Sequence, residues 1–326
     1  MFQKYRNKII FSVIFGAFIF LGLSVYANIN ELGKAFGEFN WVILPFIFFL
    51  AFCNYISRFL KWNYYTGILG IKIEKKLSFL IFLSSFIMAV TPGKVGEVFK
   101  SYLLKEQNDT PISVSAPIII AERITDFLSL ILLSIIGAIT FNYGKELIII
   151  IGIFFVVVIV IISSRKISVS IINFFEKFKI ISKISHKIRI AYDSMYQMLR
   201  PKQLFIAIFL SMVAWFFECF AFFMVINNFG FEKAVSVNLP TATFIYGFAT
   251  IAGAVTMLPG GLGATDASIT GLLVLLNIPK NISVASTLII RIATLWFAVA
   301  VGIISMVFYQ RFSLKKINEI VLDSQS

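Results

Sequence analysis

The chain has 326 residues, 59% of them hydrophobic, and a mean hydropathy of +0.92. This composition excludes an ordinary soluble domain and indicates a helical protein that crosses a membrane several times. The formal net charge of +13 would suit nucleic-acid binding, but the basic residues gather beside apolar segments. That distribution is typical of a membrane protein, so we expect no nucleic-acid partner.

Cysteine and histidine are scarce. Cys53 and Cys219 both fall inside apolar segments, so we expect free thiols, and the single histidine, His186, lies in a basic stretch. There is no Cys/His cluster with zinc-ligand spacing and no histidine near a buried nucleophile. We therefore predict no metal, no cofactor and no catalytic residues, and we favour a transporter over an enzyme.

Six apolar segments are long enough to span a bilayer. In chain order they are Ile9–Ala27, Trp41–Leu60, Ser113–Thr140, Leu147–Ser163, Leu204–Ile226 and Ser283–Phe308. The first exceeds the apolar core of a typical signal peptide, so we expect an uncleaved anchor. The predicted fold class is an all-α polytopic membrane protein.

Two further apolar blocks, Leu77–Leu104 and Leu239–Leu276, each contain a Pro-Gly break. Proline ends a helix and glycine accepts positive φ, so each break predicts a re-entrant hairpin of two half-helices. The residues of the breaks are Pro92, Gly93, Lys94, Gly96 and Glu97 in the first block, and Pro259, Gly260, Gly261, Gly263 and Asp266 in the second. A kink needed only for packing is the alternative.

One arginine follows each break at nearly the same distance. Arg123 comes 31 positions after Pro92, and Arg291 comes 32 positions after Pro259. Three spans separate the two breaks, so the hairpins would enter from opposite faces. We therefore predict an inverted internal repeat, with residues 1–140 as the first unit and 147–309 as the second; substrate sites in such proteins lie near the midplane, between the repeats.

Basic residues set the predicted orientation. With both hairpins re-entrant and the N-terminus cytoplasmic, most Lys and Arg lie inside, among them Arg58 and Lys61 at the end of the second span. A single crossing of the first block would turn the basic segment 165–202 outward, against the positive-inside rule. A double crossing has the same parity and stays open. We predict a plasma-membrane protein with both termini cytoplasmic, including a short tail at 310–326 with no room for a catalytic domain.

The segment 165–202 is basic and has apolar residues at spacings of three or four. It could form a helix lying on the anionic inner leaflet, which would then be a partner of the protein. An ordinary charged connector is the alternative.

Charged residues also occur inside the predicted spans, where they are costly and usually mark a route for a polar group. Glu122 and Asp126 are four positions apart, on one helical face, with Arg123 beside them. They could form an ion-pair network, or Arg123 could face a cavity and bind a phosphate that the carboxylates orient.

Arg291 has no acidic neighbour in sequence, so its partner must come from another segment. Asp266 and Glu218 are the two candidates. Mutual neutralisation is one interpretation, and a phosphate-bearing ligand held between Arg123 and Arg291 is the other.

At these residues the chain resembles a flippase-like membrane family. This family includes the membrane part of bacterial lysylphosphatidylglycerol synthetase and archaeal proteins linked to dolichol-phosphate sugars. The resemblance covers nearly the whole chain and rests on Arg58, Lys61, Trp62, Gly70, the segment 91–97, Glu122, Arg123, Asp126, Trp215, Glu218, the segment 258–263, Arg291, Thr294 and Trp296. Asp266 departs from the usual glutamate, and Lys94 stands where arginine is common.

The resemblance implies translocation of a phospholipid or polyprenyl-phosphate lipid with a charged head group, lysylphosphatidylglycerol among the candidates. Arg123 and Arg291 would hold the phosphate. The other predicted site residues would tune the site or take a cationic group: Lys94, Glu97, Glu122, Asp126, Glu218 and Asp266. In the synthetase a separate soluble domain performs aminoacyl transfer, so a separate lipid-modifying enzyme is a candidate partner. A lipid-modifying transferase of the phosphatidylglycerol lysyltransferase type and a transporter of soluble anions are the alternative functions.

Overall fold

The computed structural model describes residues 2–91, 97–138, 145–166, 169–170, 185–230 and 237–323. Within these ranges the chain is helical, and its only β structure is an isolated bridge between Phe39 and Phe229. The all-α fold class is therefore confirmed. Lys94 and the first break, with Pro92, Gly93 and Gly96, lie outside the described residues, so the predictions made for them stay predictions.

The described part up to residue 138 begins with a sharply bent pair of helices and ends with a long one. Its elements are α1 (Phe2–Tyr26), α2 (Ile29–Glu38), the 3₁₀ turn η1 (Trp41–Ile43), α3 (Leu44–Ile68), α4 (Lys75–Ser84), the 3₁₀ segment η2 (Ser85–Val90), α5 (Phe99–Asn108) and α6 (Ile112–Ala138). Between the apolar part of α1 and α2 the chain turns by 94°.

The remaining described part has a comparable series. Its elements are α7 (Lys145–Ser163), α10 (Ser185–Met198), α11 (Pro201–Ile226), α12 (Leu239–Val255), the 3₁₀ turn η5 (Pro259–Gly261), α13 (Ala264–Leu275), α14 (Lys280–Arg291), the π-helical η6 (Ile292–Trp296) and α15 (Phe297–Asp323). Proline lies in the first turns of α11 and α12. The N–H groups of a first turn have no intrahelical acceptor, so a residue that lacks an N–H loses no hydrogen bond there.

Three helical segments of the described chain are long and apolar enough to cross a membrane by themselves: Trp41–Ile68, Pro201–Ile226 and Lys280–Phe312. The bent pair Val13–Tyr26 and Ile29–Glu38 makes a fourth if it counts as one span. Helix α6 is 27 residues long but carries Glu122, Arg123 and Asp126 in its middle. The protein is thus a helical membrane protein with several apolar helices, and the count of six spans stays a prediction.

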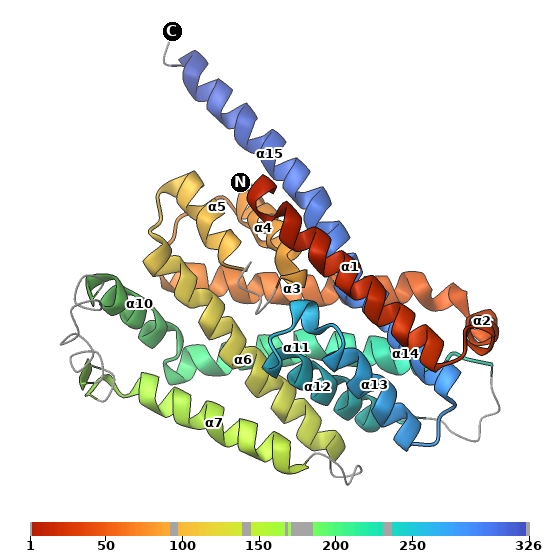
Figure 1. Ribbon diagram of the computed structural model, residues 1–326. Helices are drawn as coiled ribbons and strands as arrows, with labels where there is room; N and C mark the ends of the chain where they lie inside the picture. Colours follow the sequence, from red (N-terminus) through yellow and green to blue (C-terminus); the bar gives the residue numbers. More distant parts are fainter. Residues whose placement is uncertain are drawn as a thin grey trace.

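Helices α3 and α11 form the centre of the molecule and pack along each other (Figure 1). The Asn54 side-chain amide of α3 donates to the Ala214 carbonyl of α11 at 2.8 Å. At one end of the pair, Asn40 N–H donates to the Asn228 carbonyl at 2.9 Å, beside the β-bridge. Backbone and side-chain contacts therefore join the two parts of the chain along this central seam.

Outer helices of each part of the chain pack against helices of the other part. Segments α4 and η2 pack on α15, while α12 packs on α6. Both contacts are close at a glycine: a Cβ on Gly302 of α15 would lie 2.5 Å from the Ile87 backbone nitrogen of η2, and a Cβ on Gly247 of α12 would meet the Ser134 hydroxyl of α6. Small residues permit such close approach in membrane helices. The repeat boundaries stay predictions.

The second break has the backbone expected from its glycines. Gly260, Gly261 and Gly263 have φ of 60°, 67° and 86°, a region that other residues rarely adopt. The turn reverses the chain, so that α12 and α13 pack together as a hairpin. At ~1.5 Å per residue, the 12 residues of α13 reach about 18 Å, well short of a ~30 Å hydrocarbon core.

The basic connector is described only in part, since residues 167–168 and 171–184 lie outside the described ranges. Helix α10 buries Met195 and Met198 and exposes Lys187 and Arg189. An amphipathic basic helix is therefore present in this part of the connector. Its position on the inner leaflet stays a prediction.

Candidate functional site

The three charged residues in the middle of α6 each take a different partner. Glu122 pairs with Lys100 of α5, Arg123 with Glu97, and Asp126 with Lys61 of α3. An i, i+4 pair shares a helix face, but one step of about 100° turns a side chain to another neighbour. The predicted ion-pair network therefore exists, and its partners come from distant segments.

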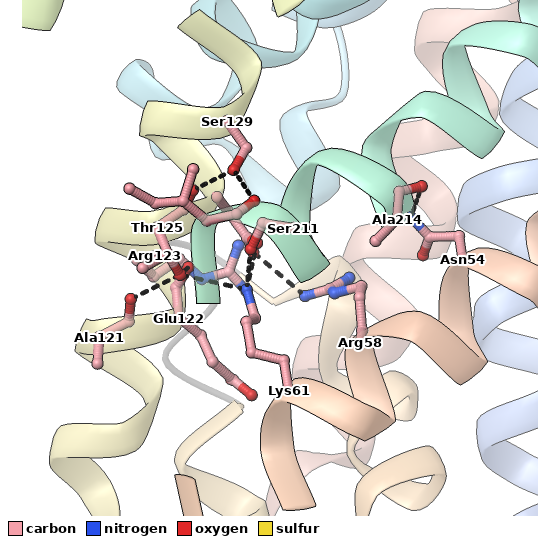
Figure 2. A network of polar contacts seen from close by, with 12 residues as sticks. Asn54, Arg58, Lys61, Ala121, Glu122, Arg123, Thr125, Ser129, Ser211 and Ala214 are labelled. Atoms are coloured by element: carbon pink, nitrogen blue, oxygen red, sulfur yellow. Dashed lines mark hydrogen bonds and ion pairs between the residues drawn. The ribbon is translucent and has the colours of Figure 1, made fainter. Parts of the chain in front are cut away.

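Asp126 and Lys61 are the centre of a buried network that joins α3, α6 and α11. Lys61 Nζ lies 2.5 Å from Asp126 Oδ1 and 2.6 Å from Ser211 Oγ, and the Ser211 hydroxyl donates to the same carboxylate at 3.0 Å. Figure 2 shows Lys61 of α3 pointing toward Ser211 of α11, with Thr125 of α6 beside them. Pairing and hydrogen bonding make a charged group tolerable at this burial.

Arg58 and Lys61 are helical residues inside the protein, whereas the positive-inside count took them as loop charges. Helix α3 continues to Ile68, which carries both residues into the protein. The Lys61 side chain is 1% exposed and that of Arg58 is 16% exposed. The positive-inside count treats any cation at the end of an apolar run as a loop residue, and the side of the membrane on which these two lie stays a prediction.

Lys100 is a second buried lysine, and its charge is held by a carboxylate and an aromatic ring. Its ammonium pairs with Glu122 and lies 4.5 Å from the centre of the Trp62 ring. An aromatic face attracts a cation, so the ring adds to the carboxylate in holding the charge.

Arg291 pairs with Asp266, one of its two predicted partners. The guanidinium Nε lies 2.8 Å from Asp266 Oδ1 in an ion pair that does not have the geometry of a hydrogen bond. The guanidinium Nη2 donates to the Gly260 carbonyl at 2.6 Å. Asp266 Oδ2 also accepts from Gly263 N–H at 2.7 Å and so caps α13. These contacts fix the second break.

Glu218 is the candidate partner that Arg291 does not take as an ion pair. Its carboxylate accepts a hydrogen bond from the Tyr246 hydroxyl at 2.7 Å, which links α11 to α12.

The two halves therefore contain corresponding arginine–carboxylate pairs. Glu97 follows the first break and is 26 positions before Arg123. Asp266 follows the second break and is 25 positions before Arg291. In each half, the arginine takes the acid of its own half's break.

A cavity of about 300 Å³ lies between the two parts of the chain. Its walls include residues from α3, η2, α6, α11, α12, η5 and the α14–α15 region, and it is partly open. Six of the predicted site residues line it, namely Glu97, Arg123, Glu218, Gly260, Gly261 and Arg291. Five others do not line it: Glu122, Asp126 and Asp266 are buried in ion pairs, and Pro259 and Gly263 belong to the turn.

The site residues predicted from the sequence left out several polar residues of this region, namely Arg58, Lys61, Lys100 and Tyr246, although the first two carry part of the family resemblance. A signal existed for α3, where Asn54, Ser57 or Arg58, and Lys61 recur at helical spacing along an apolar run. Such a polar stripe in a membrane helix indicates a face turned toward protein.

No group of three or more His, Cys, Asp or Glu side chains is placed to hold a metal ion in the ranges that the structure describes. Both cysteines there are free thiols, as predicted.

Apolar helices, a broken hairpin and paired buried charges beside a cavity lined by three arginines define a polytopic membrane protein with charged residues in its interior. The chain belongs to the family described as the lysylphosphatidylglycerol synthase TM region, whose model matches residues 9–302. It is similar to a UPF0104 membrane protein of Methanocaldococcus jannaschii, at 25% identity over 96% of this chain and 98% of the relative. A UPF0104 membrane protein of Methanothermobacter thermautotrophicus is 24% identical over 82% of this chain and 84% of its own length.

Proposed function

We propose that the protein translocates a lipid with a phosphate-bearing head group, with the head group passing through the cavity between the two halves. The observation that carries this proposal is that one cavity is lined by both motif arginines, Arg123 and Arg291, and by the glycines of the second break. The lipid is a phospholipid or a polyprenyl phosphate of the plasma membrane, and lysylphosphatidylglycerol is among the candidates.

The architecture supports this function. Non-helical backbone at membrane depth is tolerated where it lines a cavity or is buried in protein, and the turn at Gly260 and Gly261 does both. The exchange of contacts between α4–η2 and α15, and between α12 and α6, is what an inverted repeat would make. In this proposal both hairpins are re-entrant and both termini are cytoplasmic.

The side chains of the cavity suit an anionic group beside apolar chains. The Arg123 side chain is 22% exposed, that of its partner Glu97 is 12% exposed, and the Arg123 Nε has no hydrogen-bond partner among the residues that the structure describes. A guanidinium binds phosphate through paired N–H donors, and Arg123 retains donors for that purpose. Glu97 holds the guanidinium when no head group is present.

Lipid movement in proteoliposomes tests the proposal. Fluorescent phosphatidylglycerol, its lysyl ester and a polyprenyl phosphate are compared in wild type, in Arg123→Gln, and in Arg200→Gln as an exposed arginine control. We expect head-group-selective movement that falls at least about 10-fold in Arg123→Gln, the loss of one charge-assisted contact, and is unchanged in Arg200→Gln. Wild-type vesicles that move none of the three lipids, with or without an ion gradient, would contradict it.

A further inference from the structure

Arg58 is the arginine of the cavity that has no hydrogen bond within the described part of the chain. It lines the same cavity as Arg123 and Arg291, and its side chain is 16% exposed. Among the described residues its ionic neighbour within 4 Å is Asp126, with 3.7 Å between Arg58 Nη2 and Asp126 Oδ2. That separation exceeds hydrogen-bond length, so the pair is only a loose electrostatic contact.

Asp126 is already engaged by a closer cation. Lys61 lies 2.5 Å from Asp126 Oδ1, and Ser211 donates to the same oxygen at 3.0 Å. Arg58 and Lys61 are one helical turn apart on α3, so both approach this carboxylate from the same side. The lysine takes the close position, and the guanidinium extends past it along the cavity wall.

The other two arginines of the cavity have closer partners. Arg123 is paired with Glu97, and Arg291 is held by Asp266 and by the Gly260 carbonyl. Arg58 instead lies 5.9 Å from the centre of the Phe86 ring. At about the 6 Å limit of a cation–π contact the ring attracts the guanidinium only weakly, and it leaves the N–H donors of Arg58 available.

Two cations of α3 share one carboxylate on this wall. Arg58 and Lys61 both neighbour Asp126. Glu218 of α11 brings a further carboxylate to the same cavity, where it accepts a hydrogen bond from Tyr246. An anionic ligand would give the Arg58 guanidinium a close partner, since the carboxylate beside it is already held by Lys61.

We propose that Arg58 is the principal anion-binding residue of the cavity, and that it receives the phosphoryl oxygens of the ligand. Arg123, on α6, is the second donor. Figure 2 labels both arginines, Arg58 on α3 and Arg123 on α6. The inference rests on the proposed function only for the source of the phosphoryl group. A lipid head group is the source if the protein moves lipids, and a free phosphate is the other source of the same chemistry.

Binding measured without transport tests this inference. Purified protein in an uncharged detergent is titrated with short-chain phosphatidylglycerol and, separately, with inorganic phosphate. The signal is the fluorescence of Trp215, which lines the cavity, with Trp215→Phe identifying its share among the four tryptophans. The variants are Arg58→Gln, Arg58→Lys and the exposed control Arg200→Gln, and the melting temperature of each is recorded.

We expect Arg58→Gln to weaken binding by about 10- to 100-fold, the size of one charged hydrogen-bond contact, at an unchanged melting temperature. Arg58→Lys should recover part of the affinity, and Arg200→Gln should bind as wild type does. Dependence on Arg58 in the phosphate titration would assign recognition to the oxyanion itself. The same dependence with phosphatidylglycerol alone would assign it to the lipid head group.

Wild-type affinity in a folded Arg58→Gln protein would overturn the inference, as would wild-type protein that binds neither probe. If Arg58→Gln does not fold, Arg58→Lys decides: wild-type affinity there, with a lowered melting temperature, would mean that Arg58 only neutralises Asp126. The two proposals fail separately. Arg58-dependent binding without lipid movement would leave the anion site standing, and lipid movement unaffected by Arg58→Gln would leave translocation standing alone.

Discussion

The two arginine–carboxylate pairs occupy corresponding places in the halves, but they differ in how firmly they are held. Arg291 is 8% exposed, its partner Asp266 is 0% exposed, and the pair is tied to the turn through the Gly260 carbonyl and Gly263 N–H. Arg123 is 22% exposed and has one carboxylate partner, Glu97. The same sequence pattern therefore makes a structural clamp in one half and a more accessible pair in the other.

This difference indicates how the halves divide their tasks. A buried pair that also caps a helix cannot release its arginine without leaving a charge and a helix end unsatisfied. The Arg123–Glu97 pair, which lines the cavity and caps no helix, loses less when a ligand replaces the carboxylate. We therefore expect the second half to provide the rigid wall of the cavity and the first half, with Arg58 and Arg123, to provide most of the ligand contacts.

The largest expected effect is that of removing each arginine in turn. Arg291→Gln should destabilise the protein by about 3–5 kcal/mol, because it leaves the buried Asp266 charge without its cation. Arg123→Gln should cost less, about 1–3 kcal/mol, because the Glu97 side chain that loses its cation is 12% exposed whereas that of Asp266 is 0% exposed. Thermal unfolding of both proteins in the same detergent measures the difference. Equal losses of stability in the two variants would mean that the pairs are equivalent.

The next effect concerns the two close helix contacts. Gly302→Ala should cost about 2–3 kcal/mol, because the new Cβ would meet backbone atoms of Ile87 and Phe86 that cannot rotate away. Gly247→Ala should cost less, because the Ser134 hydroxyl in its way can turn, although the carbonyl of Leu130 lies 3.6 Å away. Unfolding midpoints measure both, and Ser134→Ala in the Gly247→Ala background is the control. A Gly247→Ala variant as unstable as Gly302→Ala, and not rescued by Ser134→Ala, would refute this ranking.

Changing the side-chain length of Asp266 and of Glu97 tests the same difference between the two arginine–carboxylate pairs. Asp266→Glu should cost about 1–2 kcal/mol even though it keeps the charge, because an extra methylene must fit a fully buried site and the Gly263 cap is displaced. Glu97→Asp shortens a partly exposed side chain and should melt near the wild-type temperature. The melting temperatures of the two proteins are the readout. A stabilised Asp266→Glu would show that the shorter acid is not required by the turn.

The smallest effect expected is in the packing behind the second hairpin. Thr270 of α13 and Thr287 of α14 share a buried hydrogen bond of 2.9 Å between their hydroxyl groups. Thr287→Val keeps the shape but removes this bond, and should lower stability by about 1 kcal/mol. Amide exchange in α13 should rise as the hairpin loosens. Unchanged exchange would indicate that apolar packing alone holds α13.

The sequence predicted the helical class and the place of the second break, and it reduced the partner of Arg291 to two candidates, Asp266 and Glu218, because these depend on local signals. Apolar run length, glycine and proline chemistry, and a shortage of acids near Arg291 are all readable along the chain. The partners of Arg123 and Lys61 are not, because Arg123 has two competing acids beside it in sequence, Glu122 and Asp126, and because Lys61 pairs with a carboxylate 65 positions away. Helix rotation and packing decide which carboxylate each cation takes. Charge alone does not distinguish the alternatives, because any pairing of one cation with one carboxylate is neutral.

The π-helical turn at Ile292–Trp296 has a consequence for how the halves fit together. A π turn holds more residues than an α turn, and each residue rotates a helix by about 100°. The turn lies between Arg291, which pins the second break, and Gly302, which contacts η2 of the other half; within it the Thr294 carbonyl accepts from the Tyr55 hydroxyl of α3 at 3.0 Å. The wide turn therefore sets the rotation of α15 about its axis relative to α14. Deleting one of its residues would rotate the face of α15 that carries Gly302 away from η2, while the contacts of Arg291 would stay in place.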